Sequence, residues 1–160
     1  MDSTQVVIFF IDELKKKIYL VKKEVAHKPH LSYLHLKLNG FGGGIEEFDE
    51  NEYVAARREI HEELGIDLNT FEVNRVGRFL TDKGVVGVFT ATCNDSNSSL
   101  LQVGYIKNEG EANWYDFDYI VEHTKELPDG YVELYHKLFA RVSNFELDFR
   151  NNSIPLNTNT

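Results

Sequence analysis

The stretch that decides the fold is residues 44–66, GIEEFDENEYVAARREIHEELGI, which predicts an amphipathic α-helix that begins shortly after a run of glycines. Apolar side chains recur there at helical spacing, at Tyr53, Ala56, Ile60 and Leu64. Asp49 is expected to cap the N-terminus of this helix, with Glu52 as its reciprocal partner three residues later. Gly65 is placed to end the helix in a left-handed conformation.

Three glutamates of this helix, Glu59, Glu62 and Glu63, are spaced i, i+3 and i+4, which places them on one face. Like charges at this spacing destabilise an isolated helix by about 0.2–0.5 kcal/mol per pair. Divalent cations would reverse the sign of this effect, because Mg²⁺ binds carboxylate oxygens together with the phosphate oxygens of a substrate. Arg58 can pair with a carboxylate and orient it. A solvated acidic helix face is the alternative interpretation.

Residues 39–44, Asn-Gly-Phe-Gly-Gly-Gly, are predicted to form a glycine-rich loop before the helix. Gly42, Gly43 and Gly44 let the backbone approach a ligand or metal closely and offer it amide and carbonyl groups. A lone glycine loop is a weak signal, since turns use glycine constantly. The loop and the glutamate helix together favour a metal-dependent site.

The composition is that of one compact domain without a basic nucleic-acid footprint. The chain has 160 residues, 42% of them hydrophobic, and 17 Lys and Arg against 26 Asp and Glu give a net charge of −9. Tight binding to a long nucleic acid needs a basic surface and is not expected. A small anionic substrate is compatible with this charge if metal ions supply positive charge locally. The single cysteine, Cys93, excludes an intrachain disulfide.

Residues 1–10 include a short apolar run that lacks the basic segment and cleavage site of a secretory signal. Asp12 and Glu13 interrupt the run too early for a membrane span. We therefore expect a cytoplasmic protein that does not enter a membrane. A monomer and a homodimer are both compatible with the sequence.

Strands interleaved with two helices predict an α/β (α+β) fold in which a mixed sheet packs between helices. Strands are predicted at residues 4–12, 18–25, 34–38, 100–106 and 112–115. Residues 71–80 and 85–92 are predicted to form a hairpin around residues 81–84. A second amphipathic helix is indicated by Tyr131, Leu134, Tyr135, Leu138, Phe139 and Val142. Residues 151–160 are polar and are expected to form a disordered tail.

The glycine run and the helix together resemble the Nudix signature, G-x5-E-x7-R-E-U-x-E-E-x-G-U, where U is a bulky aliphatic residue. Its constrained positions are all filled, by Gly44, Glu50, Arg58, Glu59, Ile60, Glu62, Glu63, Gly65 and Ile66. The chain is therefore identified as a member of the Nudix hydrolase superfamily. The resemblance implies a single Nudix domain over residues 1–150, folded as an α/β/α sandwich.

The resemblance also implies roles for the residues of the motif. Glu62 and Glu63 would bind Mg²⁺ or Mn²⁺, and Glu59 would be a further ligand or would help to activate water. Arg58 would hold a glutamate by a salt bridge. A backbone carbonyl of Gly44, or of the residue before it, would complete the metal coordination.

Residues 108–114, NEGEANW, offer two further carboxylates before a predicted strand. Members of the family often recruit one acid from outside the motif, which makes Glu109 and Glu111 candidate metal ligands. Exposed loop glutamates are the alternative interpretation of both residues.

Residues 39–43, NGFGG, resemble a segment of the oxidised-purine nucleoside triphosphatases, a subfamily in which the Asn reads the base. Residues 127–130, LPDG, resemble its Trp-Pro-Asp-Asp element. The candidate substrate-binding residues on this basis are Asn39, Phe41, Gly42, Gly43 and Asp129. An amide and a carboxylate together could read the donor and acceptor edge of a purine.

Three departures from that subfamily affect the expected substrate. Gly44 replaces a Lys, Leu127 replaces the Trp, and Gly130 replaces the second Asp. Leu127 removes an aromatic stacking surface, so the resemblance does not imply selectivity for oxidised guanine.

The expected activity is a metal-dependent hydrolysis of a nucleoside diphosphate-X substrate. The leading candidate is a nucleoside triphosphate, normal or oxidised, cleaved to the monophosphate and pyrophosphate. Dinucleoside polyphosphates and nucleotide sugars are alternative substrates. A nucleotide-binding module of the same fold without catalysis is a further alternative.

Overall fold

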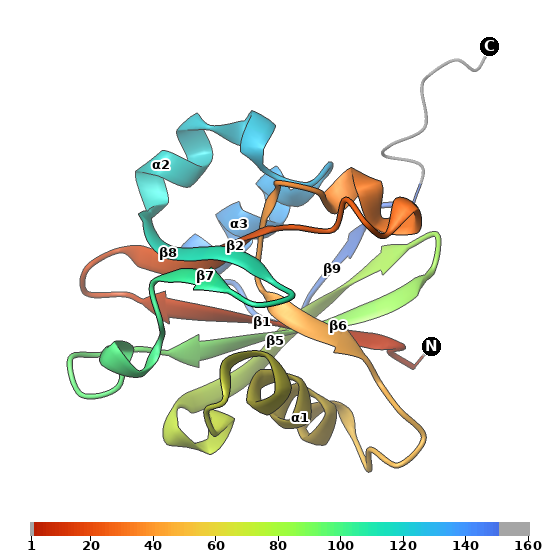
Figure 1. Cartoon of the computed structure of the whole chain (residues 1–160), viewed down its shortest axis with the longest axis horizontal. Helices are drawn as coiled ribbons and strands as arrows, with labels where there is room; N and C mark the ends of the chain where they lie inside the picture. The colour runs from red at the N-terminus through yellow and green to blue at the C-terminus, as the bar shows by residue number, and fades with distance from the viewer. Residues whose placement is uncertain (1, 151–160) are drawn as a thin grey trace.

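The structure, a computed structural model, describes residues 2–150, so the predicted tail at residues 151–160 lies outside the described residues. The helices are α1 (Glu52–Leu64), α2 (Phe117–Glu122) and α3 (Tyr131–Phe139). Helix α1 lies on one face of a central sheet, and α2 and α3 lie on the other (Figure 1). This arrangement confirms the predicted sandwich of helices around a mixed sheet.

The sheet is mixed and is built around two long neighbouring strands at its centre. Its strands are β1 (Gln5–Asp12), β2 (Lys17–Lys23), β3 (Leu38–Asn39), β4 (Phe41–Gly44), β5 (Glu72–Thr81), β6 (Gly84–Thr92), β7 (Gly104–Ile106), β8 (Gly110–Asp116) and β9 (Phe145–Asp148). The order is β7-β8-β2-β1-β6-β5-β9, with β3 paired to β2 and β4 paired to β1. Strand β1 runs parallel to β6, and β5 runs parallel to β9. The β5–β6 hairpin confirms the one predicted from the sequence.

Strand β1 changes partner along its length, and this change creates the space for a site. Its first half pairs with β4, from Gln5 opposite Gly44 to Ile8 opposite Phe41, whereas its last residues pair with β2. Gly40, between β3 and β4, lies so close to β1 that a Cβ atom on it would be 2.5 Å from the Ile8 carbonyl oxygen. The predicted loop over residues 39–44 is therefore wrong for β4, because β1 supplies hydrogen-bonding partners for its backbone.

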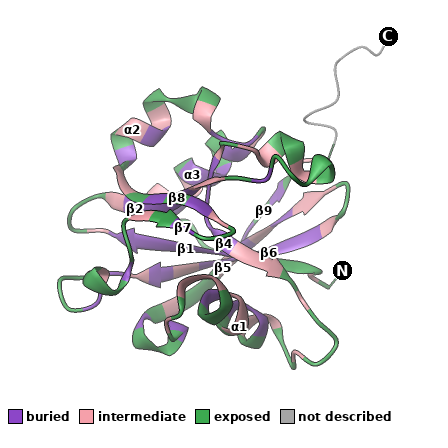
Figure 2. Ribbon diagram, viewed as in Figure 1, coloured by how far each residue is buried: buried purple, intermediate pink, exposed green. Residues whose placement is uncertain are grey.

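Two hydrophobic cores lie on opposite faces of the sheet, as the alternation of side chains along β1 requires. The core beneath α2 and α3 takes Val7, Phe9 and Ile11 from β1. The core beneath α1 takes Val6, Ile8 and Phe10. Figure 2 shows the buried residues concentrated along the central strands between the two helical layers.

Two other local predictions are wrong. The strand expected at residues 34–38 does not form over residues 34–37, because Leu34 ends a 3₁₀ helix, η1 (Pro29–Leu34), and the turn that follows it includes Leu36 with a φ of 60°. Only the last residue of the expected strand, Leu38, belongs to β3. Helix α3 ends at Phe139, so Val142 lies outside it and is exposed. The chain turns there through Arg141, which has a φ of 58°.

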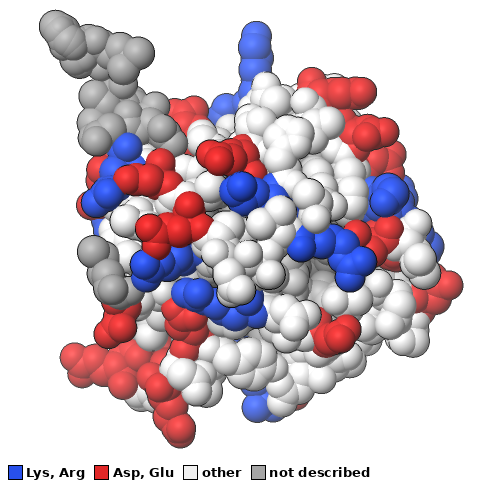
Figure 3. All heavy atoms as spheres, turned by 180° about the vertical axis from the view of Figure 1, so that it is seen from behind, with Lys and Arg blue, Asp and Glu red and all other residues white. Residues whose placement is uncertain are grey.

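The surface carries charges of both signs. Figure 3 shows Lys and Arg side chains interleaved with Asp and Glu side chains across the back of the molecule. Among the described residues, no helix has both the length and the apolar character needed to cross a membrane.

Candidate active site

Helix α1 is capped at both ends, which fixes the helix that carries the glutamates. Asn51 Oδ1 accepts a hydrogen bond from the Val54 amide at 2.9 Å, and Gly65 ends the helix with a φ of 70°, as predicted. The predicted capping pair is wrong, because the carboxylates of Asp49 and Glu52 bind arginine side chains instead.

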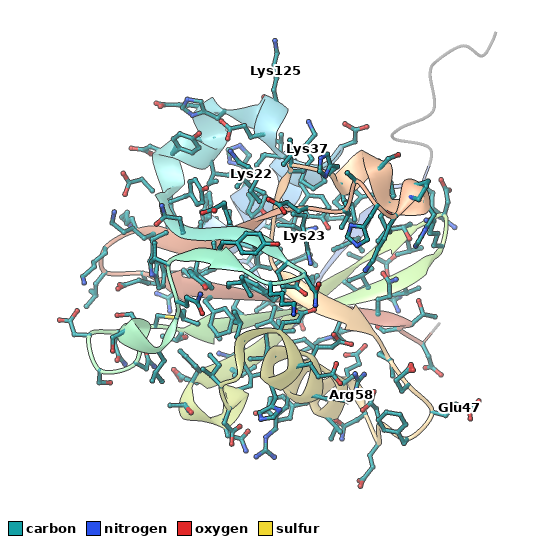
Figure 4. The ribbon with its side chains drawn as sticks, viewed as in Figure 1. Lys22, Lys23, Lys37, Glu47, Arg58 and Lys125 are labelled. Carbon is teal, nitrogen blue, oxygen red and sulfur yellow. The ribbon has the colours of Figure 1, made fainter. Side chains whose placement is uncertain are left out.

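Arg58 links the loop before α1 to two glutamates of the helix. Its guanidinium donates to both carboxylate oxygens of Asp49, at 3.0 and 2.8 Å, and to the Gly44 carbonyl oxygen at 2.9 Å. It also donates to Glu59 at 3.1 Å and to Glu62 at 3.3 Å. The hydrogen bond with Arg58 lowers the pKa of Asp49. Arg58 therefore orients glutamates, from the position on α1 that Figure 4 labels.

Glu59 and Glu63 lie against the glycines of β4. The Gly42 amide donates to Glu63 Oε1 at 3.1 Å, and a Cβ atom on Gly43 would lie 2.6 Å from the Glu59 carboxylate. Burial raises the pKa of Glu63 to about 9, and the negative charges of Glu109 and Glu59 add to this rise. Burial also raises the pKa of Glu59. The glycines of β4 thus leave room for two closely spaced carboxyl groups. The positive charge near these groups is not sufficient to offset the rise in their pKa.

Lys23 and Glu109 form an ion pair beside these carboxyl groups. Lys23 Nζ lies 3.1 Å from Glu109 Oε1, and the two side chains are only 17% and 14% exposed. The charge of Lys23 acts on Glu63, where it opposes the rise of the pKa. Glu109 is thus brought to the site, whereas Glu111 is exposed on β8 and is not part of the cavity wall. Sequence reasoning missed Lys23, since a lysine at the end of a strand is common.

The donor set suits a hard divalent cation whose coordination is completed by substrate. Mg²⁺ is commonly held by one or two carboxylates together with waters and substrate phosphates. Glu59 and Glu63 supply two adjacent carboxyl groups, and the Gly44 carbonyl oxygen keeps one lone pair beside its bond to Arg58. Among the residues that the structure describes, no three His, Cys, Asp or Glu side chains converge to enclose a metal. The Glu62 side chain is 54% exposed and reaches toward Arg58.

Binding of Mg²⁺ to the metal-free protein at about pH 7.5 is expected to release about one proton, because the cation needs an ionised carboxylate. The proton comes from Glu63, whose pKa of about 9 keeps it protonated at that pH. Calorimetry in buffers of different ionisation enthalpy measures the release. An unchanged binding enthalpy across the buffers would contradict the expectation.

The same pKa sets the pH dependence of stability in the metal-free protein. The folded state holds this proton up to about pH 9, whereas the unfolded chain loses it near its ordinary pKa of 4.5. The stabilising contribution of the protonated Glu63 is therefore complete below that ordinary value and decreases as the pH rises toward 9. Unfolding by denaturant at several pH values in the presence of a chelator measures this decrease, which the Glu63→Gln variant should lack.

A cavity of about 610 Å³ lies beside the glutamates. Its wall includes Gly42, Gly43 and Glu63 from the site, and also two of the predicted base-reading residues, Asn39 and Asp129. The volume lies in the range typical of small-molecule sites. The structure therefore brings one glutamate of the motif and most of the predicted substrate-binding residues to a single cavity.

Asn39 is held in place at the cavity wall. It is 7% exposed, its Oδ1 accepts a hydrogen bond from the Gly40 amide at 2.7 Å, and its Nδ2 lies 3.4 Å from the Tyr131 hydroxyl. Phe41 is not brought to the cavity, because its side chain is fully buried and stacks on Tyr19 with ring centroids 5.5 Å apart. Tyr131 takes its place among the polar groups facing the cavity, although the sequence marked it only as an aromatic residue of the second amphipathic helix.

A lysine at the tip of the β5–β6 hairpin also lines the cavity. Lys83 Nζ donates to the His30 carbonyl oxygen at 3.1 Å and lies 5.4 Å from the ring centroid of Tyr33. All three residues line the cavity. The hairpin is thereby tied to η1, although 53 residues separate Lys83 from His30.

Comparison with known proteins gives one family. The profile of the NUDIX domain family matches residues 2–138. The mMutator MutT protein from Bacillus halodurans is similar over 92% of this chain and 89% of its own, with 17% identity and a TM-score of 0.66. An Ap4A hydrolase from C. elegans is similar over 86% and 96%, with 15% identity and a TM-score of 0.62. A NUDIX hydrolase from Nitrosomonas europaea is similar over 94% and 81%, with 16% identity and a TM-score of 0.61.

No curated protein matches the chain by sequence. The solved structures share its fold at identities too low to indicate a common substrate. The family profile, in contrast, spans most of the chain, including the glutamate helix, β4 and most of the residues that line the cavity. The chain therefore belongs to the NUDIX domain family, whose hydrolases act on phosphorus-containing anhydrides.

Proposed function

We propose that this chain is a Mg²⁺-dependent pyrophosphohydrolase that cleaves a nucleoside triphosphate to the monophosphate and pyrophosphate. The observation that carries the proposal is the Glu59–Glu63 pair packed against β4, with Glu63 on the wall of a cavity that also presents Asn39 and Asp129. The first pair suits a metal-bound diphosphate, and the second pair suits the polar edge of a base. Members of the family generally need a divalent metal, and Mn²⁺ would suit the same oxygen ligands.

The residues of the site have different roles in the hydrolysis. Bound Mg²⁺ would neutralise phosphate charge and lower the pKa of a coordinated water. An ionised carboxylate of the Glu59–Glu63 pair accepts the proton of the attacking water, a new bond forms between that oxygen and phosphorus, and pyrophosphate leaves. Lys23 adds positive charge for the phosphates at the same end of the cavity. Arg58 keeps Glu59 and Glu62 oriented and is not part of the cavity wall.

A substrate panel analysed by chromatography tests this proposal. The panel contains normal and oxidised purine triphosphates, dinucleoside polyphosphates, ADP-ribose and nucleotide sugars, each with Mg²⁺ and with Mn²⁺. The expected products are a nucleoside monophosphate and pyrophosphate in equal amounts, and only when a divalent cation is present. Release of inorganic phosphate alone, or faster cleavage of the dinucleotides and sugars, would contradict the proposed substrate.

The same panel separates catalysis from binding alone. A nucleotide-binding module would be stabilised against heat by its ligand but would form no product from any compound. Thermal stabilisation without hydrolysis would therefore overturn the enzymatic assignment.

A further inference from the structure

A segment outside the family match contributes to the cavity wall. The match ends at residue 138, whereas β9 follows it and pairs in parallel with β5 (Figure 1). Phe145 of β9 packs against Gly77, where a Cβ atom would lie 2.5 Å from its ring. The Phe149 amide then donates to the Leu80 carbonyl oxygen at 2.8 Å. Phe149 is therefore held by the sheet.

The ring of Phe149 ends a cluster of three aromatic side chains at the cavity. Its centroid lies 4.8 Å from that of Phe79 and 5.6 Å from that of Tyr131, and all three residues line the cavity. Phe79 and Tyr131 are 3% and 8% exposed, whereas Phe149 is only partly buried. The ring face that this cluster offers to a ligand is therefore that of Phe149.

Two other positions near this wall are less suited to stacking on a base. Leu127, at the position where a stacking Trp is expected from the resemblance, is aliphatic and 3% exposed, so it lies in the core. The ring of Tyr33 lies beneath the ammonium of Lys83. Phe149 thus supplies an apolar surface that the sequence around Leu127 lacks.

Tyr131 connects this apolar surface to the polar groups of the cavity. Its ring packs on Phe149, and its hydroxyl lies 3.4 Å from Asn39 Nδ2. A planar group that lies on Phe149 would therefore have hydrogen-bonding partners beside it. Aromatic bases combine a π-face with a polar edge, which matches this pair of surfaces.

We propose that Phe149 is a substrate-binding residue that stacks on the base of the nucleotide through its ring face, a proposal that rests on the proposed function. Stacking of a base on an aromatic side chain accounts for about a tenfold to hundredfold difference in affinity. The contact is tolerant of the base, so selection among bases falls to Asn39, Tyr131 and Asp129.

Calorimetric binding of GMP, AMP and ribose 5-phosphate to the full chain and two variants tests the proposal without requiring turnover. Phe149→Leu should weaken the binding of both nucleotides about tenfold and leave that of ribose 5-phosphate, which lacks a base, unchanged. Phe149→Tyr keeps the ring and should bind all three ligands as the natural chain does.

The matched control is Phe139→Leu. Phe139 is also a partly buried aromatic residue, stacked on Phe117 at 4.0 Å, but it is not part of the cavity wall. Its variant should show any general loss of packing as a lower melting temperature, with nucleotide affinity unchanged.

Two results would overturn the role of Phe149. One is equal weakening of nucleotides and ribose 5-phosphate by Phe149→Leu, and the other is the absence of any affinity difference between the natural chain and that variant. The chromatographic analysis of the substrate panel shows independently whether the chain hydrolyses a nucleotide. A chain that binds GMP through Phe149 but forms no product would retain this inference and lose the proposed function.

Discussion

Replacement of Glu63 by glutamine is expected to lower the turnover number for diphosphate hydrolysis by about hundredfold or more. Glutamine keeps the shape of the side chain and a group that can accept the Gly42 amide, but it cannot carry the negative charge that a cation requires. Because Glu63 is protonated near neutral pH in the metal-free protein, the neutral amide should leave the fold intact. Steady-state kinetics with saturating Mg²⁺, together with the melting temperature, measures both effects.

Two further variants test whether the effect on turnover is specific to the glutamates of the motif. Glu62→Gln should also reduce turnover by orders of magnitude, although the Glu62 side chain is more exposed than that of Glu63 and contacts Arg58. Glu47→Gln is the matched control, since Glu47 is exposed and points outward from the loop between β4 and α1 (Figure 4). Full turnover in both the Glu62 and Glu63 variants would rule out the metal role of this helix.

Alanine substitutions at Gly42 and Gly43, two neighbouring glycines of β4, are expected to have different effects. A Cβ atom on Gly42 would lie 2.0 Å from the Val6 carbonyl oxygen in β1, so backbone atoms of two paired strands would have to separate. Gly42→Ala should therefore cost about 3 kcal/mol of folding free energy. The melting temperature should fall by about 10 °C for a chain of this size.

Gly43→Ala is expected to preserve the fold and reduce activity about tenfold to hundredfold, because the new methyl group displaces the Glu59 carboxylate and not the backbone. Gly44→Ala serves as the stability control, since no atom lies within 4 Å of its added Cβ. Calorimetric melting and initial rates with Mg²⁺ distinguish the two effects. Equal melting temperatures for Gly42→Ala and Gly44→Ala would contradict the packing argument.

The glutamate helix was predictable because its information is local. An apolar stripe of period 3.6 and a terminal glycine specify α1 without reference to the rest of the chain. Its N-terminal cap was not predictable, because Asp49 and Asn51 are both good capping residues two positions apart. Arg58 decides between them by binding Asp49, which leaves Asn51 to accept the Val54 amide.

Strand β4 shows why a glycine-rich segment misleads a local prediction. Glycine has low strand propensity, and three glycines in succession are typical of a loop. The register that places Gly43 opposite Val6 makes the segment a strand, and it also removes the side chains that would exclude Glu59. The same pairing thus decides both the local structure and the room for the site.

The sequence by itself determined the family, the α/β/α architecture, the β5–β6 hairpin and the presence of three glutamates on one helical face. These features depend on spacing and periodicity within short segments. The tertiary structure alone decided that Lys23 meets Glu109, that Tyr131 meets Asn39, and that Phe149 reaches the cavity. Each of these contacts joins residues that are distant in the chain, and it depends on strand register and on the close packing of elements.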